Sequence, residues 1–196
     1  MRLVLASSSP RRAELLSAAG FSFEILPVHL DEGFRPGETA EQYVARLAQA
    51  KATAAAGPLS TVAGPLPEVV LGADTTVVCD GQILGKPADA TDAARMLRLL
   101  AGRTHDVLTG ICLLKGSQRL VHVERSRVRM SSMSDAEIAW YIASGEPMDK
   151  AGGYAAQGRA SRFIEAIDGS YSNVVGLPVA RVYTLLKELG YDILKT

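Results

Sequence analysis

Residues 69–84 read Val-Val-Leu-Gly-Ala-Asp-Thr-Thr-Val-Val-Cys-Asp-Gly-Gln-Ile-Leu, and this stretch decides the expected fold. Apolar and β-branched residues fill Val69 to Cys79, which is typical of a buried strand. Asp80-Gly81 is a common pair in tight turns between antiparallel strands, so Gln82-Ile83-Leu84 is expected to pair back on the same strand. The sheet is therefore expected to contain antiparallel pairs.

Helices and strands alternate on both sides of this stretch. Further strands are expected at residues 3–6, 21–26, 104–114, 119–130 and 163–167. Helices are expected to begin at Pro10 after Ser9, at Asp92, at Pro178 and at the capping patterns Thr39-Ala40-Glu41-Gln42 and Ser134-Asp135-Ala136-Glu137. The proline-rich stretch Gly57 to Pro67 is expected to be a loop. Helices interleaved with hairpins predict an α/β fold with a mixed sheet.

Composition limits the class of protein. The 196 residues suffice for one domain spanning residues 1–196, or for two lobes that share a sheet. No apolar run reaches the roughly 18 residues of a membrane span, and the apolar start is too short for a signal peptide. The formal net charge of zero gives no support for general nucleic-acid binding. Cys79 and Cys112 lie in apolar runs, so buried free thiols and a cytoplasmic location are expected.

A first candidate site is Ser7-Ser8-Ser9-Pro10-Arg11-Arg12, which lies between an expected strand and an expected helix. Free backbone N–H groups, the positive end of a helix dipole, hydroxyls and two guanidinium groups would suit a phosphate. A capped helix followed by two solvated arginines explains the same residues equally well. This stretch alone leaves both interpretations open.

A second candidate is Asp74, because its carboxylate interrupts a run that is apolar on both sides. A charge there is unfavourable unless it is paired or bound to a metal. The alternative is a carboxylate at a strand bulge satisfied by backbone donors, and we favour the functional interpretation because strand-end carboxylates beside phosphate sites are typical magnesium ligands. Asp31-Glu32, taken alone, would be a solvated surface pair.

Three further residues are ambiguous by themselves. Lys51 falls on an expected helix near core positions, where a lysine stem often extends to solvent. Lys86 lies in the turn Gly85-Lys86-Pro87, where an exposed lysine is the simpler interpretation. His105 lies in an expected strand, where a structural hydrogen bond is more common than catalysis. Neither lysine belongs to a Walker phosphate loop, and the histidines are too scattered for a zinc site.

Taken in order, these pieces resemble the Maf family of nucleotide pyrophosphatases. The resemblance spans nearly the whole chain and rests on Ser7-Ser8-Ser9-Pro10-Arg11-Arg12, Asp31-Glu32, Lys51, Gly72-Ala73-Asp74-Thr75, Gly85-Lys86-Pro87, Gly102-Arg103-Thr104-His105, Asp149-Lys150-Ala151-Gly152, Gln157-Gly158 and Gly169-Ser170-Tyr171-Ser172-Asn173. Each stretch alone is weak evidence, and their combination is highly specific.

The resemblance implies an elongated α/β fold, similar to inosine triphosphate pyrophosphatase, with a mixed central sheet and two lobes around a cleft, often as a homodimer. It implies hydrolysis between the α- and β-phosphates of a nucleotide with a divalent cation, Mg²⁺ or Mn²⁺. The implied catalytic residues are Asp74 as general base with Lys51 and Lys86. The implied metal-binding residues are Glu32 and Asp74. The implied substrate-binding residues are Ser7, Arg11, Arg12, Thr75 and Gln157.

The same resemblance bears on the substrate. A branch that acts on 7-methylguanosine triphosphate tends to carry tryptophan, glutamine and glutamate where this chain has Arg11, Thr75 and Gln157. Arginine, threonine and glutamine are similar to the branch that acts on dTTP and UTP. The chain departs from other members at Gly153 and Ala155-Ala156, beside the implied base pocket. The competing hypothesis is a nucleotide-binding regulatory module, linked to cell division or septum formation, without significant catalysis.

Overall fold

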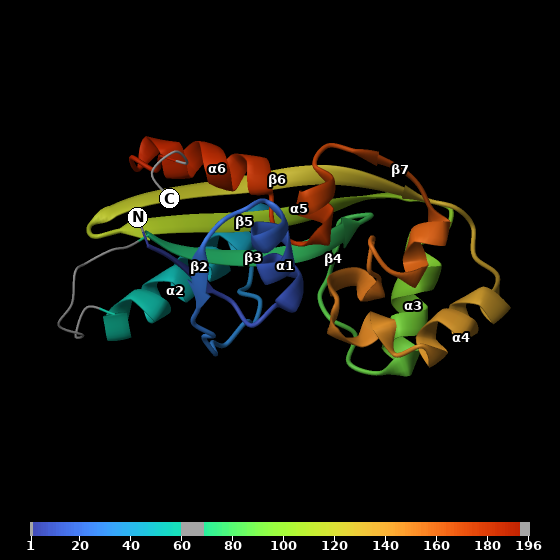
Figure 1. The fold of residues 1–196 in the computed structure, drawn as a ribbon. Helices are drawn as coiled ribbons and strands as arrows, with labels where there is room; N and C mark the ends of the chain where they lie inside the picture. Colours follow the sequence, from blue (N-terminus) through green and yellow to red (C-terminus); the bar gives the residue numbers. More distant parts are fainter. Residues whose placement is uncertain (1, 60–68, 193–196) are drawn as a thin grey trace. The chain divides into compact units, whose positions relative to one another are not determined.

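A computed structural model describes residues 2–59 and 69–192, and Figure 1 labels its helices and strands. The strands are β1 (Leu3–Ala6), β2 (Phe23–Ile25), β3 (Val69–Cys79), β4 (Gln82–Leu84), β5 (Thr104–Lys115), β6 (Gln118–Met130) and β7 (Ile164–Asp168). The helices are α1 (Pro10–Ala18), α2 (Ala40–Leu59), α3 (Ala90–Leu100), α4 (Asp135–Ala143), α5 (Tyr171–Val175) and α6 (Val179–Glu188). Short 3-10 helices cover Glu146–Asp149, Ala151–Gly153 and Arg159–Phe163.

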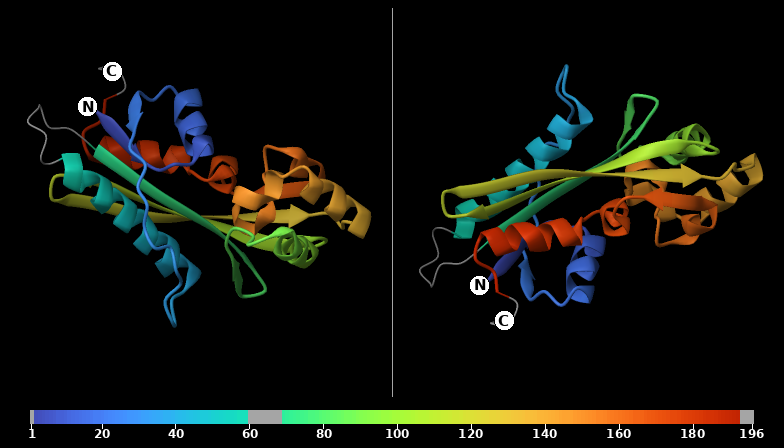
Figure 2. Two further views of the ribbon diagram at one scale, coloured as in Figure 1. Left: turned by 90° about the horizontal axis from the view of Figure 1, so that it is seen from below. Right: turned by 90° about the horizontal axis from the view of Figure 1, so that it is seen from above.

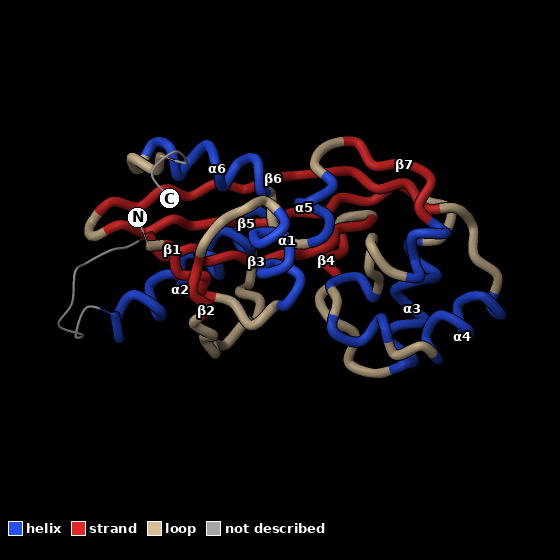
Figure 3. The backbone as a smooth tube through the Cα atoms, in the orientation of Figure 1, coloured by secondary structure: helices blue, strands red, loops and turns tan. Residues whose placement is uncertain are grey.

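The described strands form one mixed sheet, drawn in red in Figure 3, which confirms the predicted fold class. Its order is β2-β1-β3-β5-β6-β7, and β4 pairs with β3 outside this path. β1 runs parallel to both β2 and β3, whereas β4 is antiparallel to β3 and β7 is antiparallel to β6. The Asp80-Gly81 turn joins β3 to β4 as predicted, and Asp80 takes the positive φ of 49° that such a turn requires.

The chain divides into two compact units, which are described separately. The first unit contains the described residues of Met1–Asp74, Thr109–Glu124 and Gly176–Thr196. The second unit contains Thr75–Leu108 and Arg125–Val175. The elongated shape and the cleft implied by the family resemblance stay predictions.

In the first unit, side chains alternate between two faces of the sheet because successive residues of a strand point to opposite sides. Leu3, Leu5 and Leu71 pack with residues of α1 and α6, including Leu16 and Leu186. Val4, Ala6 and Val70 pack on the other side, against the alanine-rich surface of α2. The two views of Figure 2 show α2 and α6 on opposite faces of the strands.

Two glycines let α2 approach the sheet closely. A Cβ atom at Gly72 of β3 would lie 2.2 Å from the carbonyl oxygen of Ala48, and one at Gly110 of β5 would lie 2.3 Å from that of Val44. Both carbonyls belong to the backbone of α2 and cannot move aside locally. The helix backbone therefore lies against the strands at a distance that only glycine permits.

The second unit has its own core. Residues of β3, α3 and α4, among them Val77, Leu97, Leu100 and Tyr141, pack into one buried cluster with residues of the loop that follows α4. Ser134 accepts a hydrogen bond from the backbone N–H of Glu137, and the Glu137 carboxylate accepts one from the backbone N–H of Ser134, so the capping box predicted for α4 is confirmed.

The expected loop from Gly57 to Pro67 is wrong at its start. Helix α2 continues through Gly57, Pro58 and Leu59, because the alanines before them have high helix propensity and outweigh one glycine and one proline in the last turn. Residues 60–67 of that expected loop lie outside the described residues. The reciprocal hydrogen bonds of Thr39 and Gln42 confirm the predicted start of the helix. No helix of the described part of the chain is long and apolar enough to cross a membrane.

We expect Gly110→Ala to destabilise the first unit, because the added methyl group meets the α2 backbone. Overpacking of a core typically costs 1–3 kcal/mol, and a clash with backbone places this substitution near the upper end, at about 3 kcal/mol. Urea unfolding followed by circular dichroism measures the change. Gly85→Ala is the control, since a Cβ there meets nothing within 4 Å and should change stability by less than about 1 kcal/mol. Equal effects of both substitutions would contradict the packing argument.

Candidate active site

Lys51 is the centre of a cluster of charged side chains in the first unit. It projects from α2 and is only 7% exposed. Its Nζ atom lies 2.6 Å from Asp74 Oδ1 and 2.5 Å from Glu32 Oε1. Asp74 lies in β3 and is also 7% exposed, whereas the Glu32 side chain, on the loop after β2, is 42% exposed. The fold thus brings together three charged residues that are far apart in the sequence.

The glycine contacts explain why Lys51 reaches Asp74. Gly72 lies two residues before Asp74 on β3, and Ala48 lies three residues before Lys51 on α2. Because the two backbones meet at Gly72 and Ala48, the lysine lies beside the carboxylate and its ammonium group is bonded within the fold. The sequence-based alternative of a lysine that extends to solvent is therefore wrong.

Asp74 is a stronger base than an ordinary aspartate. Burial raises its pKa, the positive charges of Lys51 and Arg12 oppose this rise, and the negative charge of Glu32 adds to it. The net direction is upward. A higher pKa means that the carboxylate holds a proton more readily, which suits a group that must accept one from water.

Arg12 is buried and connects three segments of the first unit. Its Nη1 donates to the carbonyl oxygen of Ala73 at 2.9 Å and to Ser7 Oγ at 3.1 Å, and its Nε donates to the carbonyl oxygen of Gly176 at 2.8 Å. Burial lowers the pKa of Arg12, and the charge of Asp74 opposes this shift. The interpretation of Arg12 as a solvated arginine is wrong, and Arg11 remains partly exposed.

Ser7 is buried and ties the loop before α1 together. Its Oγ accepts hydrogen bonds from Arg12 and from the backbone N–H of Ser9, and the Ser9 side chain makes no cap bond to the helix. Since Arg12 also bonds to Ala73, which precedes Asp74, the loop of residues 7–9 is fixed to the strand that carries Asp74. This arrangement keeps the start of α1 in a defined position.

Thr75, Lys86 and Gln157 belong to the second unit, whereas Lys51 belongs to the first. Lys86 and Gln157 are exposed, and Thr75 is partly buried. Within this unit, the N–H of Gly152 donates to the carbonyl oxygen of Gly85 at 3.0 Å, which links the Lys86 turn to the loop that precedes Gln157. Their roles at the phosphates and the base stay predictions.

The backbone around Gln157 is held on both sides by two side chains that the sequence did not single out. Tyr141 Oη accepts a hydrogen bond from the N–H of Ala155 at 3.1 Å and donates to Glu146 Oε1 at 2.8 Å. Glu146 Oε2 accepts from the N–H of Arg159 at 3.1 Å. The residues before and after Gln157 are thus anchored to one pair of side chains. No sequence signal could have identified this pair, because its partners are backbone amides.

Comparisons with known proteins identify the family of this chain. A profile of the family described as "Maf-like protein" matches residues 2–189. The chain belongs to the Maf family. It is 50% identical over 190 residues to a "dTTP/UTP pyrophosphatase" of Koribacter versatilis, covering 97% of this chain and 95% of the relative. It is also 50% identical to a "dTTP/UTP pyrophosphatase" of Hahella chejuensis, over 98% of this chain and 94% of the relative.

A solved structure supports the fold of this Maf chain independently of sequence. The Staphylococcus aureus Ham1 protein superposes with a TM-score of 0.52 at 11% identity, and the alignment covers 96% of this chain and 99% of the Ham1 chain. At this identity the similarity concerns the fold alone.

The acidic pair of the Maf site fits a divalent cation that also binds phosphate. Glu32 and Asp74 converge on a single cationic nitrogen, which shows that the fold can direct both carboxylates to one positive centre. Among the described residues, no group of three or more His, Cys, Asp or Glu side chains could hold a metal ion. Mg²⁺ usually needs only one or two carboxylates, because waters and substrate phosphates complete its shell.

His105 acts structurally in the second unit. It is buried, its Nε2 lies 2.8 Å from Tyr154 Oη, and the two rings meet edge to face. Burial lowers its pKa to about 4, so the imidazole is neutral at physiological pH. The expectation of a structural hydrogen bond is confirmed.

We expect Arg12→Ala to lower the free energy of unfolding by about 3 kcal/mol, because it leaves two buried carbonyl groups without their charged donor. Arg11→Ala is the matched control and should change stability by less than about 1 kcal/mol, since Arg11 is partly exposed. Urea unfolding of both variants measures the difference. Equal losses would mean that the bonds of Arg12 do not stabilise the fold.

The lowered pKa of His105 predicts that stability falls with acid. Between pH 6.5 and about 4 the unfolded chain takes up a proton at this residue while the folded chain does not, so unfolding becomes more favourable as the pH falls. At pH 5 the contribution is about 2 kcal/mol. Urea unfolding at pH 7 and pH 5 should show a smaller acid loss in His105→Gln than in the unsubstituted protein. The exposed His29→Gln is the control, and an unchanged acid loss in His105→Gln would refute the assignment.

Proposed function

We propose that this protein hydrolyses nucleoside triphosphates, with dTTP and UTP as substrates, to the monophosphate and pyrophosphate. The single observation that carries the proposal is the buried Asp74 carboxylate bonded to Lys51 beside Glu32, in a Maf chain. Relatives that are 47–50% identical over nearly the whole chain are named dTTP/UTP pyrophosphatases, which supports the choice of reaction and base.

Asp74 is the general base of the proposed reaction. One of its carboxylate oxygens takes a proton from the water that attacks the α-phosphorus, while the bond between that phosphorus and the bridging oxygen breaks. The bonding electrons leave with pyrophosphate. The buried position of Asp74 raises its proton affinity, and its bond to Lys51 fixes its orientation, so both observations support this role.

The cations bind the phosphates and neutralise the charge that develops on them. Lys51 already holds two carboxylates, and phosphate oxygens would compete with them for its three N–H donors. Lys86 adds a second lysine, and Ser7 and Arg12 fix the loop whose N–H groups face the phosphates. Glu32 and Asp74 would hold Mg²⁺ or Mn²⁺, which supplies charge neutralisation and lowers the pKa of bound water.

Base selection is assigned to Arg11, Thr75 and Gln157. Gln157 is exposed on a loop whose backbone is anchored by Tyr141 and Glu146, so its amide group would be available to a base in a defined position. An amide can both donate to and accept from the edge of uracil or thymine.

The proposal also includes a cytoplasmic location and a homodimer. The two buried free cysteines, Cys79 and Cys112, support the location. The mass of the purified protein in solution tests the homodimer.

A pyrophosphate-release assay across nucleotides tests the function. The panel contains dTTP, UTP, CTP, dATP, dGTP and 7-methylguanosine triphosphate, each with and without a metal chelator. We expect release from dTTP and UTP that exceeds release from the purines and disappears with chelator. Binding of nucleotides without release from any of them would instead favour the regulatory module. Preference for 7-methylguanosine triphosphate would overturn the assignment of the base pocket.

We expect Asp74→Asn to lower kcat for dTTP by at least about a hundredfold, because the amide cannot accept the proton from water. Nucleotide affinity, measured by calorimetry, should stay within a few-fold, because the substitution keeps the shape of the side chain. The control is Asp135→Asn in α4, whose carboxylate side chain is 81% exposed. Near-normal turnover of Asp74→Asn would remove this residue from the role of base.

A further inference from the structure

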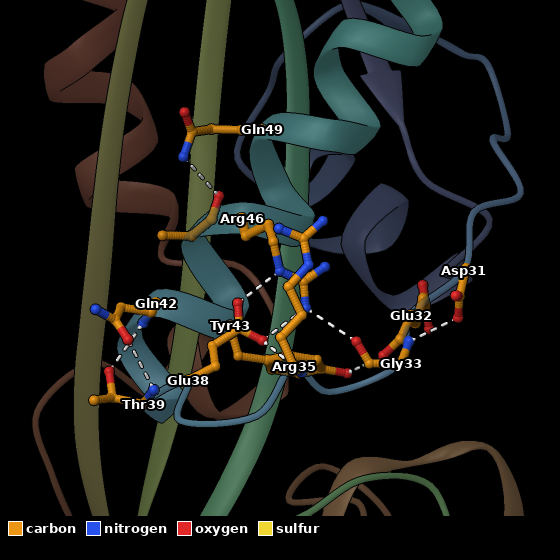
Figure 4. A network of polar contacts seen from close by, with 11 residues as sticks. Asp31, Glu32, Gly33, Arg35, Glu38, Thr39, Gln42, Tyr43, Arg46 and Gln49 are labelled. Atoms are coloured by element: carbon orange, nitrogen blue, oxygen red, sulfur yellow. Dashed lines mark hydrogen bonds and ion pairs between the residues drawn. The ribbon is translucent and has the colours of Figure 1, made fainter.

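Two side chains of α2, the helix that carries Lys51, form hydrogen bonds with the loop that carries Glu32. Figure 4 shows Tyr43 and Arg46 of α2 reaching toward Glu32 and Gly33. Tyr43 Oη donates to the carbonyl oxygen of Glu32 at 3.0 Å, and Arg46 Nη2 donates to the carbonyl oxygen of Gly33 at 3.0 Å. Two successive peptide groups of the loop are therefore bonded to side chains of one helix.

The same two side chains are themselves held in place. Arg46 forms a bidentate ion pair with Glu38. Its Nε lies 2.6 Å from one carboxylate oxygen, and its Nη2 lies 2.7 Å from the other. The guanidinium carbon of Arg46 lies 5.6 Å from the centre of the Tyr43 ring, within the range of a cation–π contact. The Phe34 ring stacks on the Tyr43 ring with centroids 3.9 Å apart. The hydroxyl of Tyr43 thus has little freedom to leave its partner.

These two hydrogen bonds are needed because Glu32 lies on an exposed loop. Its side chain is 42% exposed and belongs to a loop, so solvent weakens its ion pair with the buried Lys51. The loop also turns locally, since the N–H of Gly33 donates to Asp31 Oδ1 at 2.9 Å. Fixing the carbonyl groups of residues 32 and 33 determines where the Glu32 carboxylate can reach.

We propose that Tyr43 and Arg46 are positioning residues that act through Glu32: they hold its backbone so that its carboxylate stays at Lys51, beside Asp74. The proposal rests on the proposed function, because it gives the position of Glu32 a catalytic purpose. Helix α2 then positions both Lys51, which it carries, and Glu32, which its side chains hold.

The test is a double-mutant cycle between Tyr43 and Glu32. Tyr43→Phe removes one hydroxyl and keeps the ring that stacks on Phe34. We expect kcat for dTTP to fall about tenfold or more with KM nearly unchanged, the scale seen when a group that orients a site residue is lost. In a Glu32→Gln background, the same substitution should change kcat by less than about twofold, because the residue through which it acts is already inactive. Tyr183→Phe in α6 is the matched control and should leave kcat unchanged.

Two outcomes overturn the proposal. One is a Tyr43→Phe enzyme with kcat within twofold of normal. The other is a loss that persists in full in the Glu32→Gln background, which would mean that Tyr43 acts through packing. Arg46→Lys gives an independent variant if Tyr43→Phe cannot be purified, since lysine cannot reproduce the bidentate ion pair with Glu38. It is subject to the same two criteria.

A readout without substrate separates this proposal from the proposed function. Hydrogen exchange of the backbone amides of residues 31–38 should be at least about tenfold faster in Tyr43→Phe than in Tyr183→Phe. If the unsubstituted protein releases no pyrophosphate from any nucleotide, the proposed function fails, and this exchange still tests whether Tyr43 holds the loop. If the protein is active and exchange is unchanged, Tyr43 does not hold the loop, and the proposed function stands.

Discussion

The buried bond between Lys51 and Asp74 is the interaction on which the rest of the site depends. Both side chains are almost fully removed from water, and burying a charge is strongly unfavourable unless an opposite charge accompanies it. Removing either partner would leave the other charge uncompensated. An apolar pair of similar volume would serve stability as well or better. The presence of two buried charges at this position therefore agrees with a chemical use of the carboxylate.

The backbone makes this bond possible. Gly72 and Gly110 allow α2 to lie against β3 and β5, and the small side chains of Ala48 and Ala52 keep the helix close to the sheet. With larger residues at these positions, α2 would move away from the strands and Lys51 would move with it. The position of the charged cluster is thus a consequence of packing between a helix and a sheet.

Much of this could be predicted from the sequence where the signal is local. The turn at Asp80-Gly81 indicated an antiparallel pair, the two capping patterns located helix starts, and the charge of Asp74 in an apolar run indicated a carboxylate that needs a partner, which the structure supplies in Lys51. The sequence could not separate a solvated Arg12 from a buried one, because its acceptors are carbonyl groups of Ala73 and Gly176, far along the chain.

Contacts to backbone atoms account for most of what sequence reasoning missed. Tyr43 lies on α2 and is buried. Its hydroxyl bonds to a carbonyl oxygen, a partner that every residue possesses and that no motif can reveal. The pair Tyr141 and Glu146 was missed for the same reason, since it bonds to backbone amides. Side chains that hold loops are recognisable only once the loop path is known.

Charge balance explains how such a site can meet a triphosphate. In the first unit the cations Lys51 and Arg12 offset the carboxylates Glu32 and Asp74, so these four side chains together carry no net charge. An incoming triphosphate adds negative charge that they do not neutralise, and its phosphates compete with the carboxylates for Lys51. Without further positive charge, binding the substrate would raise the proton affinity of Asp74 and displace Glu32. The reaction proposed for this protein therefore requires an additional cation and a loop that keeps Glu32 in place. Tyr43 and Arg46 hold this loop through their bonds to the carbonyl groups of residues 32 and 33.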